Sequence, residues 1–313
     1  MNRNAINSNL LILLLMMIVC SCAEDQKSFD YKPIIVDFSN QMNEKKIDNS
    51  GINLKPVEVA IAAMTSPNET YKYYHELIQY FSLKLKRQIH IIQRKTYAEI
   101  NSLITQDKVD LAFICSGAYI TALEENLPLE ILTIPIINNK AYYHAYIIVN
   151  TESRISTFND LKGKSFAFTD PLSNTGFLYG KALIKDCNES VDKFFTKTMF
   201  TYGHDYSIQA VERKIVDGAT VNSLIFDYIK KKYPERVSHI KIINVSEPFG
   251  IPPVVVRKNL DNNLKIQFRN LFLNLQLDTL GSEILKKLMI DRYNIPDSTD
   301  YSSILQKSRF VGK

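Results

Sequence analysis

The chain has 313 residues, of which 45% are hydrophobic, and a formal net charge of +5. This length suggests two domains of ordinary size, and the composition is sufficient for a large core. The charge is mild, and the basic runs at 84–87 and 230–232 are typical of solvated helix faces, so we expect no nucleic-acid partner.

The first residues have the pattern of an export signal. Arg3 is the only charge before the apolar run at 10–19, which is too short for a membrane span and fits the core of a secretory signal. The following Val-Cys-Ser-Cys resembles the lipobox of bacterial lipoproteins, which implies removal of residues 1–21 and acylation of Cys22. Cys20 is the competing acceptor, and a plain secretory signal is the alternative.

A polar stretch follows the expected cleavage point. Residues 22–53 are predicted to form a tether with one strand near 33–38. Of the remaining cysteines, Cys115 lies in an apolar run and Cys187 near a helix end. A buried free cysteine behaves as a small hydrophobe, so we favour two unpaired thiols, although a disulfide stays open.

The rest of the chain alternates strand-like and helix-like segments, which indicates an α/β sheet with crossover helices. Strands are expected at 57–62, 89–92, 111–114 and 143–149. Helices are expected at 71–85, 97–106 and 117–125. A second alternating series runs from about 160 to 243, and the pattern from 254 to 292 is helical.

One turn has the residue types of an anion-binding helix start. Residues 164–168 look like a buried strand, Asp170 and Pro171 signal a turn, and Ser173, Asn174 and Thr175 can cap the helix expected at 177–185. Unpaired N–H groups at a helix N-terminus favour phosphate, phosphonate or carboxylate. A cap that serves only the helix is the alternative.

Several segments together resemble one family, the phosphate, phosphite and phosphonate substrate-binding proteins of ABC transporters, in a lipoprotein subgroup. The segments that carry the resemblance are 147–153, 161–164, 169–176, 203–204, 210–211 and 216–219, with 64–67 and 113–119 typical of the subgroup. The resemblance implies a type II periplasmic-binding-protein fold, in which two α/β lobes are joined by two crossover strands with a ligand cleft between them. We expect lobe I at 54–149 and 251–313, lobe II at 150–250, and crossovers near 149–150 and 246–250.

The resemblance also assigns ligand-binding residues. The family's serine-threonine-serine turn falls on Ser173, Asn174 and Thr175, so an amide replaces the middle hydroxyl. The binding histidine falls on His204, whose ring could donate to an oxyanion, more strongly when protonated. Tyr97 and Tyr143 match tyrosines of the first lobe, although chance placement is an alternative explanation for each.

Other candidates come from strand ends and helix starts. Ser66, followed by Pro67 and Glu69, predicts a capping box, and Ser116 begins another helix. Both lie after strands, where ligands of open α/β sheets bind, but capping alone would explain them. Asn222 is a neutral candidate for the outer end of the ligand.

Two positions argue against a cationic ligand tail. Relatives that take aminoalkylphosphonates present acidic residues to the ammonium group, and the matching positions here are Leu224 and Pro252. A buried ammonium without a partner is costly, so we expect discrimination against aminoalkylphosphonates.

Together these observations predict a lipid-anchored substrate-binding protein on the periplasmic or cell-envelope face. It would be monomeric, need no cofactor or metal, and deliver phosphate, phosphite or a short alkylphosphonate to an ABC permease. The alternative is a sensor of the same fold that signals to a membrane kinase or cyclase. An enzyme is disfavoured, because the chain has no Gly-x-Ser-x-Gly elbow and His75 lacks the second histidine of a zinc-protease helix.

Overall fold

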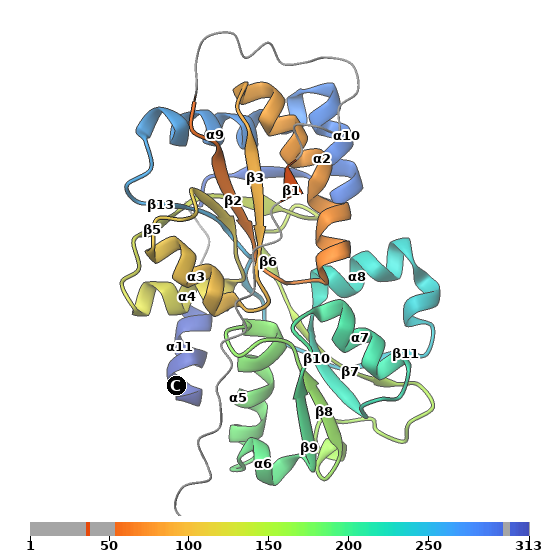
Figure 1. Ribbon diagram of the computed structural model, residues 1–313. Helices are drawn as coiled ribbons and strands as arrows, with labels where there is room; N and C mark the ends of the chain where they lie inside the picture. The colour runs from red at the N-terminus through yellow and green to blue at the C-terminus, as the bar shows by residue number, and fades with distance from the viewer. Residues whose placement is uncertain (1–35, 38–53, 297–300, 313) are drawn as a thin grey trace, which may run out of the picture. The chain divides into compact units, whose positions relative to one another are not determined.

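Two main β-sheets organise this computed structural model, which describes residues 36–37, 54–296 and 301–312 (Figure 1). The expected signal peptide, Cys22 and nearly all of the expected tether lie outside the described residues. In the described chain the larger sheet consists, in spatial order, of β1 (Val36–Asp37), β3 (Ile89–Gln93), β2 (Val57–Ile61), β4 (Leu111–Phe113), β13 (Val254–Arg257), β5 (Leu129–Ile136) and β14 (Arg292–Asn294). β2 pairs in parallel with β3 and β4, whereas β13 is antiparallel to β4 and β5.

Alternating side chains of β2 build two separate cores on the faces of this sheet. Val59 packs with α2 (Pro67–Leu85), α9 (Asn262–Asn274) and α10 (Thr279–Leu288), in a cluster rich in phenylalanine. Ala60 faces the other way, toward α3 (Tyr97–Thr105) and α4 (Ser116–Glu124). Helices therefore cover both faces of the sheet. This agrees with the sequence of β2, in which successive side chains point to opposite faces and Val59 and Ala60 are both apolar.

A second sheet of five strands has the order β11 (Ile240–Val245), β7 (Ala145–Asn150), β10 (Gly218–Asn222), β8 (Ser165–Phe168) and β9 (Lys197–Phe200). β8 is parallel to β9 and β10, and β7 is antiparallel to β10 and β11. Its helices are α5 (Tyr179–Asp186), α6 (Val191–Phe194), α7 (His204–Glu212) and α8 (Ser223–Lys232). Short helical turns cover Asn159–Leu161, Pro234–Val237 and Leu275–Leu277.

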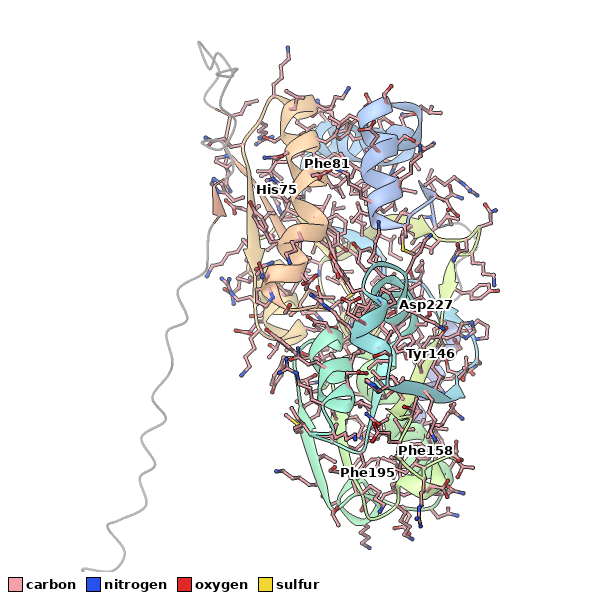
Figure 2. The ribbon with its side chains drawn as sticks, turned by 90° about the vertical axis from the view of Figure 1, so that its right-hand side faces the viewer. His75, Phe81, Tyr146, Phe158, Phe195 and Asp227 are labelled. Atoms are coloured by element: carbon pink, nitrogen blue, oxygen red, sulfur yellow. The ribbon has the colours of Figure 1, made fainter. Side chains whose placement is uncertain are left out.

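Aromatic rings fill one core of the second sheet. The Phe166 and Phe195 rings stack with their centroids 4.4 Å apart. The centroid of the Phe158 ring lies 6.5 Å from that of Phe195, and Figure 2 labels Phe158 and Phe195. The opposite face of the sheet is covered by α7 and α8, whose apolar residues pack on Ile148. This α/β architecture confirms the predicted fold class.

The chain passes twice between the sheets. β6 (Tyr142–Tyr143) precedes β7, β12 (Phe249–Gly250) precedes β13, and β6 and β12 pair with each other in antiparallel fashion. β7 pairs with β10 from Ala145 to Val149 and with β11 as far as Asn150, so the first passage lies before β7 rather than at the expected 149–150. An apolar strand pattern predicts burial but does not say which sheet the strand joins.

The C-terminal region differs from its predicted helical pattern. The segment 254–292 begins with β13, whose valines are buried in the centre of the larger sheet, and ends at the start of β14. The last described helix, α11 (Ser302–Val311), contacts α4 but also α5 of the second sheet, through buried Ile304. No helix among the described residues is long and apolar enough to cross a membrane.

Candidate ligand-binding site

The turn after β8 forms a buried, polar helix start. Ser173, Asn174 and Thr175 are fully buried, and the Ser173 hydroxyl accepts a hydrogen bond from the Gly176 N–H at 3.0 Å. The predicted cap is therefore confirmed. The helix begins, however, as a π-helical turn (Asn174–Leu178), a wide turn that occurs often at functional sites.

His204 lies at the first position of α7 with its ring fully buried. Its Nδ1 accepts a hydrogen bond from the Asn222 backbone N–H at 3.1 Å. A backbone amide can only donate, so Nδ1 carries no proton and the neutral ring holds its proton on Nε2. Burial lowers the pKa of His204 to about 3. Without a ligand the ring is thus neutral and can donate through Nε2. The stronger donation expected of the protonated ring stays a prediction.

Polar atoms without a partner gather around this turn. Within the described chain, the Tyr97 hydroxyl, Asn174 Oδ1, Thr175 Oγ1 and His204 Nε2 are buried and make no hydrogen bond. The Asn174 amide nitrogen donates to the Tyr143 hydroxyl at 3.3 Å, which links a fifth predicted residue to the group. Each unpaired buried group costs roughly 1–3 kcal/mol, so such a concentration indicates the place of a ligand.

The two buried tyrosines are donors as well. Tyr97 and Tyr143 are each about 1% exposed, and burial raises the pKa of both hydroxyls well above the ordinary value. Both therefore remain protonated at neutral pH. The site thus combines hydroxyl, amide and imidazole groups that can donate to an oxyanion.

The N-terminus of α4 lies directly against this turn because residue 117 is glycine. A Cβ there would lie 2.2 Å from the Leu172 carbonyl oxygen and 2.6 Å from the Asn174 nitrogen. Cys115 occupies the N-cap position of α4 without a side-chain capping bond, and it is free and fully buried. Cys187 is free as well. Burial raises the pKa of the Cys115 thiol, so this thiol stays protonated.

Ser116, predicted as a ligand donor, already has a partner. Its hydroxyl donates to the Gly250 carbonyl at 2.7 Å, at the strand β12 that pairs with β6. Its role in the structure is to connect α4 to the second passage between the sheets.

The predicted capping box at Ser66 is wrong. The Ser66 hydroxyl makes no capping bond, and Glu69 pairs with Lys72 and Arg236 instead. The Ser66 N–H that Glu69 would have accepted donates to the Asp205 carboxylate at 2.9 Å. A carboxylate from a distant part of the chain has therefore taken over the cap.

A second aspartate from a distant part of the chain accepts a backbone N–H at the start of α3, in addition to the local cap. The Tyr97 N–H donates to the Asp170 carboxylate at 3.0 Å. The local capping box of this helix, between Thr96 and Glu99, is complete and was not predicted. Its sequence signal, a threonine followed three residues later by glutamate, was available.

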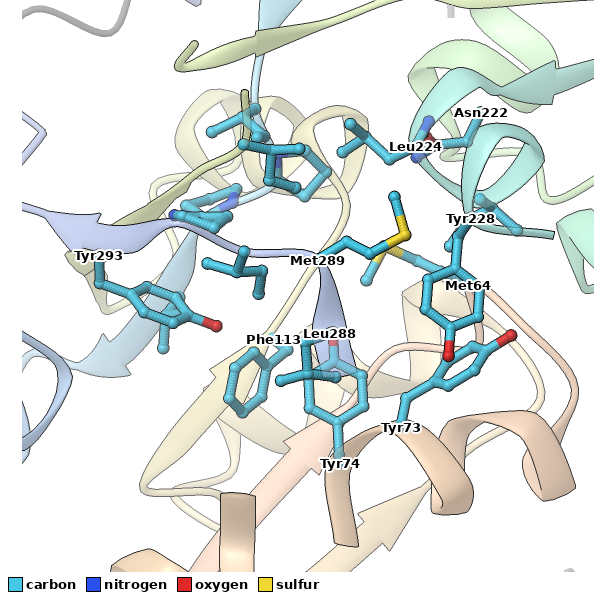
Figure 3. Close-up of a pocket in the computed structure, with 18 of the residues that line it drawn as sticks. Met64, Tyr73, Tyr74, Phe113, Asn222, Leu224, Tyr228, Leu288, Met289 and Tyr293 are labelled. Atoms are coloured by element: carbon cyan, nitrogen blue, oxygen red, sulfur yellow. The ribbon is translucent and has the colours of Figure 1, made fainter. Parts of the chain in front are cut away.

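Asn222 orients the site and also borders a cavity. Its side-chain oxygen caps α8 by accepting the Leu224 N–H at 2.8 Å, while its backbone holds His204. The cavity beside it has a volume of about 140 Å³ and is shown in Figure 3. Leu224 and Pro252, where aminoalkylphosphonate binders have acids, both line it.

Sequence reasoning missed three residues of this region. Asp170 was read only as part of a turn, Gly117 only as the start of an expected helix, and Asp205 was assigned no role of its own. Their roles depend on which segments meet in the fold, and no local pattern carries that information. The predicted residues that the fold does bring together are Tyr97, Tyr143, Ser173, Asn174, Thr175, His204 and Asn222.

The two α/β lobes have the fold of the type II periplasmic binding proteins. Two solved structures agree. A binding protein component of an ABC phosphonate transporter from Pseudomonas aeruginosa has a TM-score of 0.74 at 23% identity, covering 82% of this chain and 85% of its own. PhnD1 from Prochlorococcus marinus in complex with methylphosphonate has a TM-score of 0.75 at 17% identity, covering 82% and 98%.

Sequence comparison identifies the family. Residues 59–301 match the model of the ABC transporter, phosphonate, periplasmic substrate-binding proteins, and the chain belongs to this family. The Escherichia coli phosphonates-binding periplasmic protein is 28% identical over 240 residues, which are 75% of this chain and 70% of the relative. The Mycolicibacterium smegmatis phosphate-import protein PhnD is 26% identical over 167 residues, 50% of this chain and 52% of its own. The protein is therefore a substrate-binding component of a transporter and not an enzyme.

Proposed function

We propose that this protein captures a small phosphorus oxyanion, namely phosphate, phosphite or a short alkylphosphonate, and delivers it to an ABC permease in the inner membrane. The observation that carries the proposal is the group of unpartnered buried donors, namely the Tyr97 hydroxyl, the Thr175 hydroxyl and His204 Nε2–H. Relatives named for phosphonate binding and phosphate import support the ligand class.

The chemistry of capture is hydrogen bonding by neutral donors. The Tyr97 hydroxyl, the Thr175 hydroxyl and His204 Nε2–H would donate to the oxygens of the anion. Hydrogen bonds to a charged acceptor are about twice as strong as neutral ones, and burial strengthens them further. The fixed donors need no reorganisation, because neighbouring backbone groups already hold the ring and the turn in place.

Access to this site requires a hinge motion. The donor residues are buried, so a ligand can enter only when the two lobes separate. Two hydrogen bonds join the lobes and would form on closure. The Ser66 N–H donates to Asp205, and the Tyr97 N–H donates to Asp170. A ligand that contacts both lobes stabilises the closed state, which the permease would recognise.

Export and anchoring complete the proposal. The apolar run at 10–19 and the lipobox-like sequence before Cys22 support cleavage after Ser21 and acylation of Cys22. The lipid would keep the protein at the membrane that contains the permease, on its periplasmic side. The polar residues 22–53 would then serve as the tether.

A thermal-shift screen with phosphate, phosphite, methylphosphonate and sulfate tests the ligand class. A ligand that binds only the folded state at about 100 times its Kd adds about 2.7 kcal/mol to the free energy of unfolding. We expect at least one phosphorus oxyanion to raise Tm more than sulfate does. No shift with any phosphorus compound, or a larger shift with sulfate, would refute the proposed ligand class.

A further inference from the structure

Two of the residues that line the cavity in Figure 3 also hold His204 in place. Asn222 lines the cavity and fixes Nδ1 of the ring through its backbone N–H at 3.1 Å. Met64 lines the cavity too, and its carbonyl accepts the His204 backbone N–H at 2.9 Å. The cavity and the histidine therefore share two supporting residues.

The walls of the cavity are mostly apolar and come from both sheets. Phe113, Leu288 and Met289 contribute from the side of the larger sheet, and Leu224 and Ile225 from α8 (Figure 3). Its volume of about 140 Å³ is close to that of an engineered apolar cavity of about 150 Å³ that binds benzene. A methyl group would leave most of this space empty.

Building on the proposed function, we infer that the preferred ligand carries an uncharged, apolar substituent about the size of a phenyl ring on its phosphorus atom. The polar site would take the phosphoryl oxygens, and the apolar cavity would take the substituent. Burial of apolar surface in the cavity would then add to the affinity that the oxygens provide.

The cavity disfavours a cationic substituent. Leu224 and Pro252 place apolar groups where an ammonium would need acids. Asp227 also lines the cavity, but it is exposed to solvent and accepts a hydrogen bond from the Tyr146 hydroxyl at 3.3 Å, as the labelled pair in Figure 2 illustrates. The charge of Lys230 already acts on the Asp227 carboxylate, so a further ammonium there would gain little.

Calorimetry on the full-length protein with phosphate, methylphosphonate, 2-aminoethylphosphonate and phenylphosphonate tests this inference. We expect phenylphosphonate to bind at least tenfold more tightly than methylphosphonate, which corresponds to about 1.4 kcal/mol. Methylphosphonate or 2-aminoethylphosphonate binding as tightly as phenylphosphonate would overturn the inference and leave the proposed function intact. If none of the four compounds binds, both the inference and the proposed function are overturned.

A cavity-filling variant localises the effect. Leu224→Phe should lower the ratio of phenylphosphonate to methylphosphonate affinity at least tenfold, because the new ring occupies the space. Leu277→Phe makes the same change at a residue that is 77% exposed in a distant turn, and should leave the ratio as it is. An unchanged ratio in folded Leu224→Phe contradicts the inference. If that variant does not fold, the wild-type series decides alone.

Discussion

The carboxylate of Asp205 caps the backbone N–H of Ser66 across 139 residues of sequence, with the two atoms 2.9 Å apart. Asp205 is the residue after His204, so the helix that presents the histidine also closes the N-terminus of α2. This contact therefore joins the start of α7, which presents His204, to the start of α2.

Removal of this cap should weaken ligand binding. Loss of a helix cap costs about 1 kcal/mol, so Asp205→Ala should raise Kd about fivefold if the contact forms only on closure. Asp192→Ala, at an exposed first-turn acid of α6, is the matched control. Calorimetry that finds equal affinity in both variants would show that this contact does not contribute to closure.

The Thr175 hydroxyl should matter for binding and not for folding. A donor to a charged acceptor contributes about 1.5–3 kcal/mol, so Thr175→Val should weaken oxyanion binding about ten- to a hundredfold. Because this hydroxyl has no partner in the described structure, the variant should unfold at the same Tm or a higher one without ligand.

Thr198→Val, at an exposed position of β9, provides the same exchange away from the site. Calorimetry measures the oxyanion affinity of both variants, and thermal unfolding measures their Tm without ligand. A Thr175→Val protein that keeps its affinity but loses stability would assign the hydroxyl to the fold instead.

Gly117 should be required for full closure. In Gly117→Ala the Cβ would overlap the Leu172 carbonyl oxygen, which belongs to the turn on the opposite side. The variant should bind at least tenfold more weakly, and small-angle scattering should show less contraction on ligand addition than in the wild type. Normal affinity with normal contraction would mean that the turn can move aside.

The buried neutral His204 should make stability depend on pH. Its pKa is about 3 when folded and about 6.5 when unfolded, so between these values the unfolded state binds more protons. Stability is therefore lost as pH falls below about 6.5. From pH 7 to pH 5 the loss attributable to this residue is about 2 kcal/mol.

His204→Gln should lack this part of the pH dependence. Denaturant unfolding of the ligand-free proteins at pH 7 and pH 5 measures the difference, and the other histidines contribute equally to both proteins. Identical pH dependence in wild type and variant would mean that the ring is solvated or charged in solution.

The proposed lipid anchor can be tested on the two adjacent cysteines. Cys22→Ser should move the protein from the membrane fraction to the soluble fraction of the cell envelope, because the acylated thiol is lost. Cys20→Ser should not, since this residue would leave with the signal. The assignment would be contradicted if Cys20→Ser released the protein from the membrane and Cys22→Ser did not. It would also be contradicted if neither variant were released.

Local patterns in the sequence were sufficient to predict several individual strands and one helix cap. The apolar periodicity at 57–62 and 111–114 predicts β2 and β4 because alternate residues pack on opposite helical layers. The Ser173 cap was also predictable, since the hydroxyl and the Gly176 N–H that it accepts are only three residues apart.

Relations between distant segments were not predictable in this way. The position of β7 in the second sheet depends on which partners it meets, and its apolar pattern would suit either sheet. The cap of Ser66 by Asp205 and the tautomer of His204 likewise depend on contacts across the fold. The capping box at Ser66, which rested on a local signal alone, failed for this reason.

The most direct test of the central claim is a crystal structure of the protein grown with methylphosphonate. The account predicts density for the phosphonate oxygens within hydrogen-bonding distance of Thr175 Oγ1, His204 Nε2 and the Tyr97 hydroxyl. Ligand density elsewhere, or these three atoms paired with protein groups while the ligand binds, would contradict it.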